Sequence, residues 1–148
     1  MSLKERITDD MKAAMRAGEK ERLAAIRMIT AAIKQREVDE RISLDDGQVL
    51  SVLEKMIKQR KESVAQFAAG NRPDLVAKET AEMALLQAYL PAAMSEAEID
   101  VLVGESIAAT GAASIKDMGK VMNLVKSKAQ GRADMAAVGA KIKAKLGV

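Results

Sequence analysis

Positive charge gathers in the last third of the chain, where side chains able to bind phosphate recur among glycines and methionines. Residues 116–148 contain eight cations and two carboxylates, a net charge of +6, whereas residues 91–115 contain four carboxylates and no cation. Lysine and arginine bind nucleic-acid phosphates, and each such contact makes the affinity fall with salt. The cations that we expect to contact phosphate are Lys116, Lys120, Lys126, Lys128 and Arg132.

Two glycines interrupt this basic segment at positions where helix propensity does not favour them. Gly119 and Gly131 are expected to permit the close approach of a ligand, and close packing between helices would explain them equally well. The cations also have a second interpretation. A run of charge is typical of a solvated face, and lysines near the C-terminus of a helix interact favourably with its dipole.

Side chains for acid–base or nucleophilic chemistry are scarce. The chain has no histidine and no cysteine, which excludes an imidazole base, a Ser-His-Asp arrangement and a thiolate nucleophile or metal ligand. Ser43, Ser95 and Ser114 are better explained as helix caps. Adjacent carboxylates, as in Asp9-Asp10 and Asp45-Asp46, point in different directions on a helix and do not converge on a cation. We expect no catalytic residue, no metal site and no cofactor.

The elements that position these residues are predicted to be helices. Hydrophobic residues make up 49% of the chain and aromatic residues 1%, and a core of Ala, Leu, Ile, Val and Met favours packed helices over a β-sandwich. Apolar residues recur with helical spacing in seven segments, which predicts an all-α, multihelical fold.

Pro91 marks the expected boundary between two helical subdomains. Proline disfavours helical geometry at the preceding residue, and the charge balance changes at the same place. We expect an N-terminal helical subdomain of four helices over residues 1–90 and a C-terminal subdomain of three shorter helices over residues 91–148.

Composition also suggests a compartment. The absence of cysteine fits a reducing environment, and the N-terminal residues include no apolar signal core. The apolar runs are far shorter than the roughly 18 to 20 residues that span a bilayer. We expect a cytoplasmic protein with no membrane partner.

Several segments resemble one known family. In the second half these are Tyr89-Leu90-Pro91, the run from Lys116 to Met122, and Gly131-Arg132-Ala133-Asp134; in the first half they are Glu37-Val38-Asp39 and the run from Lys58 to Ser63. Together they resemble the YqeY-like family (GatB/YqeY domain). That family is related to the C-terminal tail of the B subunit of the glutamine-dependent aspartyl/glutamyl-tRNA amidotransferase.

The resemblance implies that residues 91–148 form an amidotransferase-tail-like subdomain that helps to engage tRNA. It also implies an amidotransferase or synthetase as a protein partner. Such families carry the label of carbon–nitrogen ligase with glutamine as amido-N-donor by kinship with the complex. We expect this chain to be a non-catalytic, tRNA-binding or amidotransferase-associated protein.

The first half keeps an alternative open, a protein–protein adaptor with no nucleic-acid contact. Charges of both signs interleave between residues 54 and 62, which is typical of a solvated face laced with ion pairs. A long amphipathic helix could instead dock a protein partner. An exposed apolar patch formed by Phe67, Met83 and Tyr89 would indicate such an interface.

Overall fold

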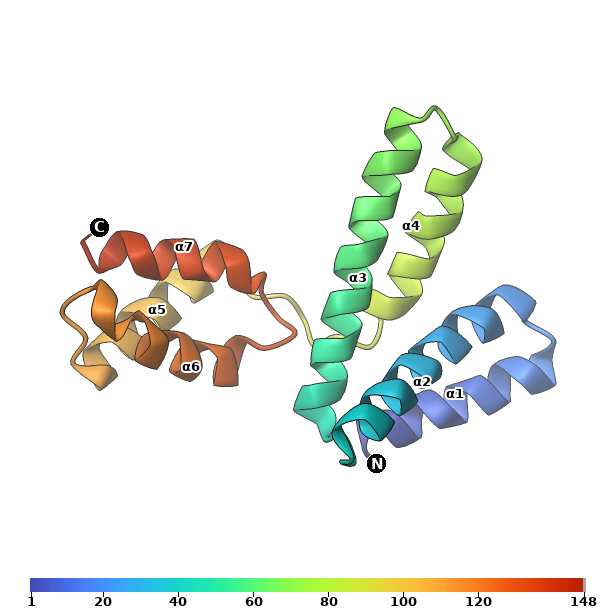
Figure 1. Ribbon diagram of the computed structural model, residues 1–148, viewed down its shortest axis with the longest axis horizontal. Coiled ribbons are helices and arrows are strands. Elements are labelled where there is room, and N and C mark those ends of the chain that lie inside the picture. The colour runs from blue at the N-terminus through green and yellow to red at the C-terminus, as the bar shows by residue number, and fades with distance from the viewer. Residues whose placement is uncertain (148) are drawn as a thin grey trace. The chain divides into compact units, whose positions relative to one another are not determined.

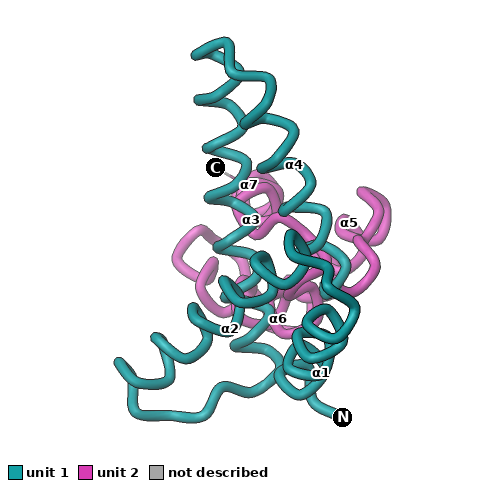
Figure 2. Tube along the Cα trace, turned by 90° about the vertical axis from the view of Figure 1, so that its right-hand side faces the viewer, with its two compact units in different colours: residues 1–90 teal, residues 91–148 magenta. Residues whose placement is uncertain are grey.

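The computed structural model describes residues 1–147, and within that range its regular structure consists of seven α-helices and one 3₁₀ turn. The predicted all-α, multihelical fold class is confirmed. The chain divides into two compact units, unit 1 over residues 1–90 and unit 2 over residues 91–148 (Figure 2).

Unit 1 consists of two helical hairpins (Figure 1). The first pairs α1 with α2, the second pairs α3 with α4, and α2 contacts both helices of the second hairpin. The helices span Leu3–Ala17 (α1), Lys20–Glu40 (α2), Asp46–Ala69 (α3) and Pro73–Gln87 (α4).

Local signals determine where these helices begin and end. Gly18 ends α1 in the left-handed conformation with φ 69°, and Pro73 occupies the first turn of α4. The predicted cap at Ser43 is wrong, because Asp45 accepts a hydrogen bond from the backbone N–H of Gln48 and caps the start of α3. The Ser43 hydroxyl instead accepts a hydrogen bond from a lysine of α1.

The core of unit 1 lies where the hairpins meet. The buried side chains of α3 all lie in its first half, from Val49 to Ile57. Beyond them the α3–α4 hairpin extends past α1 and α2 (Figure 1), so Phe67 and Met83 are only half-buried. Tyr89 is buried in the core. These three side chains therefore do not form the exposed apolar patch that would have indicated an adaptor.

Arg60 departs from the predicted solvated face of α3. Its Nε lies 3.3 Å from a carboxylate oxygen of Glu79 and 3.1 Å from one of Glu82, both on α4. The three side chains are only 15%, 17% and 21% exposed. Arg60 thus joins the two helices of the hairpin, because its position on α3 faces α4 rather than solvent.

Unit 2 is a small three-helix bundle with a 3₁₀ turn. Its elements are α5 (Glu96–Thr110), η1 (Ile115–Asp117), α6 (Met118–Ala129) and α7 (Met135–Lys145). The α-helices bury a shared apolar core, formed by Leu102, Val103, Val121, Val125, Ala129, Val138, Ile142 and Leu146. This core holds η1 and α6, which carry most of the predicted phosphate ligands.

The starts of these helices differ in how they are capped. Ser95 caps α5 as predicted, because its hydroxyl accepts a hydrogen bond from the backbone N–H of Glu98. The predicted side-chain cap at Ser114 is wrong, since its hydroxyl makes no capping bond. Asp117 closes this turn instead, by accepting a hydrogen bond of 3.1 Å from the N–H of Ala113. That bond lowers the pKa of the Asp117 carboxyl from its ordinary value.

Candidate nucleic-acid interface

The predicted phosphate ligands lie on one short stretch of unit 2. Lys116 lies in η1, and Lys120, Lys126 and Lys128 lie on α6, all with exposed side chains. Arg132 lies in the turn between α6 and α7 and is partly buried. The structure therefore brings the five cations to one helix and the turns at its two ends.

The cations do not share a single face of α6. Lys116 lies about one turn before Lys120, so these two are neighbours at the start of the helix. Lys126 and Lys128 are two residues apart, and such positions point to nearly opposite sides of a helix. The cations thus line the outer side of α6 at its start and flank the helix at its end.

The four lysines have no carboxylate partner in the described part of the chain. No ion pair joins any of them to residues 1–147. Lys120 acts on one carboxylate through its charge alone. It helps to lower the pKa of Asp117, although the backbone hydrogen bonds from Ala113 and Ser114 lower that pKa more. Exposed ammonium groups without a partner in the fold can bind an external anion at little structural cost.

Arg132 differs from the lysines because it is engaged within unit 2. Its Nε donates a hydrogen bond of 2.9 Å to the backbone carbonyl of Ala92, and its Nη2 lies 3.6 Å from a carboxylate oxygen of Glu98. The backbone carbonyl of Arg132 also accepts a hydrogen bond of 2.8 Å from the N–H of Met94. Arg132 therefore fastens the segment that enters unit 2 to the turn before α7.

The acidic residues of α5 neutralise part of the basic segment. The Lys141 ammonium lies 2.7 Å from a carboxylate oxygen of Glu96 and 2.9 Å from one of Asp100. These two carboxylates raise the pKa of Lys141, and Lys141 lowers that of Asp100. Lys145 donates to the backbone carbonyl of Asp100. The contrast between the acidic segment 91–115 and the basic segment 116–148 is therefore weaker on the folded surface than it is along the sequence.

The two predicted close-approach glycines have different surroundings. Gly119 is exposed, and a Cβ added there would meet no atom of the described chain within 4 Å, so packing inside unit 2 does not explain it. Gly131 is buried and has φ 77°, a left-handed conformation that favours glycine. The fold therefore accounts for Gly131, and it leaves the surface at Gly119 open.

Among residues 1–147, no three histidine, cysteine, aspartate or glutamate side chains are grouped so that they could hold a metal ion. No described helix combines the length and the apolar character needed to cross a membrane.

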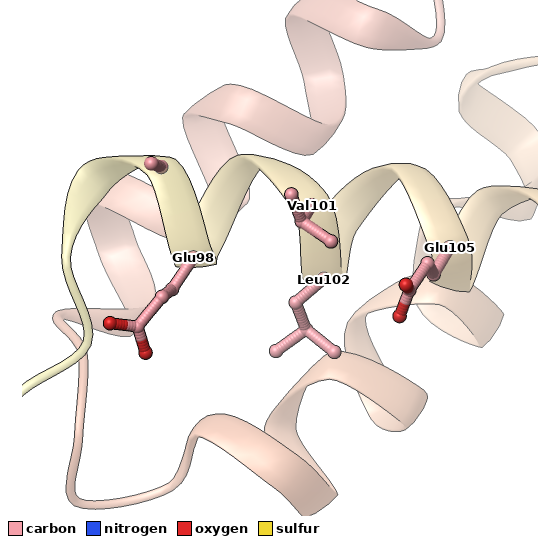
Figure 3. Close-up of a pocket in the computed structure, with 5 residues that line it drawn as sticks. Glu98, Val101, Leu102 and Glu105 are labelled. Carbon is pink, nitrogen blue, oxygen red and sulfur yellow. The ribbon is translucent and has the colours of Figure 1, made fainter.

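Sequence reasoning overlooked one surface feature, a shallow hollow on α5. It is lined by Ala97, Glu98, Val101, Leu102 and Glu105 (Figure 3). Val101 was the one indication of this hollow in the sequence. It is a large apolar residue, and it lies outside the stripe of α5 residues that faces the core of unit 2. Its side chain is 59% exposed.

The fold and the site together define a class, an all-helical protein with a four-helix unit followed by a small three-helix unit whose α6 carries exposed lysines. The chain belongs to the Yqey-like protein family, whose pattern matches residues 4–146. The resemblance found in the sequence is thus confirmed over almost the whole chain.

Curated relatives are found in yeasts. The chain is 37% identical over 93 residues to "Altered inheritance of mitochondria protein 41, mitochondrial" of Saccharomyces cerevisiae, a match that covers 62% of this chain and 50% of that protein. The protein of the same name in Kluyveromyces lactis is 39% identical over 101 residues, which covers 66% and 54%. The matches thus span about half the length of these relatives.

The prediction of a cytoplasmic location is corrected by these relatives. Their names place them in mitochondria, which conflicts with a purely cytoplasmic protein. The prediction was wrong because it used the absence of cysteine and of an apolar signal core, and neither observation distinguishes the cytosol from the interior of an organelle.

Proposed function

We propose that this chain is a non-catalytic tRNA-binding protein that acts beside the tRNA-dependent amidation machinery, and that it contacts RNA through η1 and α6. One observation carries the proposal: Lys116, Lys120, Lys126 and Lys128 are exposed and form no ion pair within residues 1–147. On α7, Lys141 is paired with the carboxylates of α5 and Lys145 donates to the Asp100 carbonyl, so among the lysines of α7 only Lys143 is exposed without an ion pair or hydrogen bond within residues 1–147.

The dimensions of α6 suit a phosphate backbone. From Lys116 to Lys128 the chain advances about 18 Å at the helical rise of 1.5 Å per residue. A nucleic-acid duplex offers several phosphates over that length. The lysines at the start and end of α6 could therefore contact phosphates of more than one nucleotide.

Recognition in this mode depends on RNA shape rather than on base sequence. Single-stranded RNA is read largely by stacking bases on aromatic side chains. The chain has two aromatic residues, and Tyr89 is buried while Phe67 is half-buried in unit 1. Lysine contacts to the backbone of a folded RNA are the mode that remains for unit 2.

Family membership supports the link to amidation. The chain belongs to the Yqey-like family, and the resemblance found in the sequence implies kinship with the tail of an amidotransferase subunit, from which the carbon–nitrogen ligase label follows. The chain has no histidine and no cysteine. We therefore assign it RNA binding, and we assign the chemistry of amide transfer to a partner.

The test is a titration of the full chain with a bulk tRNA pool, in which binding is measured by fluorescence anisotropy at each salt concentration of a series. If about four lysines contact phosphate, the logarithm of the affinity should fall linearly with the logarithm of salt, with a slope of roughly −3 to −4. A duplex DNA of matched charge serves as competitor, and it should displace tRNA poorly if RNA shape is recognised.

A matched pair of variants locates the interface. Lys120→Glu should weaken binding and reduce the magnitude of the salt slope by about one. Lys12→Glu changes the net charge equally on an exposed position of α1 and should leave binding unchanged. Equal effects of both variants, or no tRNA binding near physiological salt, would exclude α6 as a tRNA site.

A further inference from the structure

The outer face of α5 presents an apolar hollow to solvent. Its volume is about 340 Å³, and Ala97, Val101 and Leu102 form its apolar lining. Val101 is the more exposed of the two large apolar residues that unit 2 leaves on its described surface, since Ile115 is 40% exposed. Figure 3 shows the Glu98, Leu102 and Glu105 side chains extending to the same side of α5. Leu102 is only 7% exposed and belongs to the core of unit 2, so it forms the floor of the hollow, whereas Ala97, Val101 and Glu105 are exposed.

Negative charge frames this hollow at both ends. Glu98 and Glu105 are seven residues apart, which places them two helical turns or about 10.5 Å from each other. Within residues 1–147 Glu105 forms no ion pair, whereas Glu98 accepts a hydrogen bond of 3.2 Å from the Ser95 hydroxyl and lies 3.6 Å from Arg132. The other two carboxylates of α5 are neutralised by Lys141. The charge of Glu105 is therefore available to a cationic partner, and the Glu98 side chain is accessible to one because it remains 55% exposed.

We infer that this face of α5 docks a basic amphipathic helix of a partner protein. One apolar side chain of the partner fills the hollow between Glu98 and Glu105, and two Lys or Arg residues seven positions apart reach these carboxylates. The match is one of charge and length, since a partner helix laid along α5 repeats the same two-turn spacing. The inference does not depend on RNA binding by α6.

The size of the hollow favours a single helix over a second copy of the chain. The hollow is shallow and is lined by five residues of a single helix, so it offers contact to only one or two apolar side chains. A stable association between two folded surfaces needs roughly 1,200 Å² of buried area or more. A single helix is the occupant that this small apolar site can select, because the carboxylates at its ends add charge recognition.

The test uses two synthetic helical peptides and the isotopically labelled full chain. The first peptide has a leucine midway between two lysines seven residues apart, and the second has glutamates in place of the two lysines. Backbone NMR shifts should change over residues 97–108 when the lysine peptide is added. The glutamate peptide should bind at least fivefold more weakly. No shift with either peptide, or shifts confined to α6 and α7, would overturn the inference.

Charge reversal on the protein supplies the matched control. Glu105→Lys should weaken binding of the lysine peptide about three- to tenfold and strengthen binding of the glutamate peptide. Glu62→Lys alters the net charge equally on an exposed position of α3 and should change neither. Identical behaviour of the two variants would refute the site. A mass that rises with protein concentration and falls in Glu105→Lys would assign this face to self-association instead.

Discussion

Replacing Arg132 with alanine should destabilise unit 2, even though this arginine belongs to the predicted phosphate ligands. The guanidinium donates to the backbone carbonyl of Ala92 over 2.9 Å and lies near Glu98. The first contact joins the segment before α5 to the turn before α7, and the second joins the first turn of α5 to the same turn. The substitution therefore removes links between the start of unit 2 and the turn between α6 and α7.

The size of the effect follows from these contacts. A hydrogen bond from a charged donor contributes roughly 1.5–3 kcal/mol when it is shielded from water. The Arg132 side chain is 36% exposed and the Glu98 contact is long at 3.6 Å, so solvent reduces the sum to about 1 kcal/mol. For a unit of this size, such a loss lowers the melting temperature by about 4–8 °C.

Hydrogen exchange measured by NMR resolves individual amides, so it can report the stability of unit 2 separately from that of unit 1. The amides of Val121 and Val125 lie in its core, and their exchange should accelerate about fivefold in Arg132→Ala, as a loss of about 1 kcal/mol requires. Lys120→Ala is the control, since this exposed lysine has no ion pair over residues 1–147. If Arg132→Ala leaves exchange unchanged and lowers tRNA affinity as much as Lys120→Ala, the structural role argued for Arg132 is wrong.

Four further substitutions test other parts of the fold. Gly119→Ala should stabilise the chain by about 0.5–1 kcal/mol in urea unfolding, because the helix has room for the methyl group, and it should weaken tRNA binding if RNA approaches there. Gly131→Ala should destabilise it by about 1–2 kcal/mol, because alanine is strained at φ 77°; an unchanged midpoint would contradict this. Tyr89→Phe should cost about 1–2 kcal/mol through loss of the 2.6 Å bond to Asp10. Burial and this bond raise the pKa of Tyr89 above its ordinary value of 10.0. The neutral phenol therefore contributes its full stability below pH 10.0, and this contribution is lost as the pH rises through the raised pKa. If Tyr89→Phe loses the same amount of stability at alkaline pH, Tyr89 is not the cause of that loss. Hydrogen bonds lower the Glu37 pKa, so its contribution is present above the ordinary value of 4.5 and lost as the pH falls through the lowered one, and Glu37→Gln should flatten this acid limb in pH-dependent unfolding.

Helices could be predicted from the sequence because their signals are local. Apolar spacing located the inward faces, and Gly18 and Gly111 both end their helices in the left-handed conformation. Capping was less certain, since several polar residues precede α3 and each could begin a helix. Asp45 rather than Ser43 became the cap because Gln48 completes a reciprocal pair of hydrogen bonds with it.

Ion pairs could not be predicted because their partners are distant in sequence. Arg60 meets carboxylates about twenty residues later on α4, and Lys141 meets Asp100 over 41 residues. Only the packing of the helices brings these groups together. A net charge of +6 near the end of the chain therefore overstated the charge of the folded surface.

In the candidate site, too, the local features could be predicted from the sequence and the long-range contacts could not. Lysines on α6 could be recognised from residue type alone, whereas the structural engagement of Arg132 required the position of Ala92. Whether these residues bind RNA stays a prediction. The hollow on α5 depends on which side of the helix unit 2 leaves uncovered, and Val101 was the only hint of it in the sequence.

The two proposed surfaces of unit 2 make opposite demands on charge, which allows one pair of variants to separate them. Lys120→Glu removes a cation from α6 and should weaken tRNA binding without affecting the lysine peptide. Glu105→Lys removes an anion from α5 and should weaken the lysine peptide while leaving tRNA binding unchanged or slightly stronger. If the general electrostatic field of the protein governed both interactions, each substitution would change both the tRNA affinity and the peptide affinity, because long-range fields do not distinguish helix faces. Independent responses would therefore establish that α5 and α6 carry separate sites.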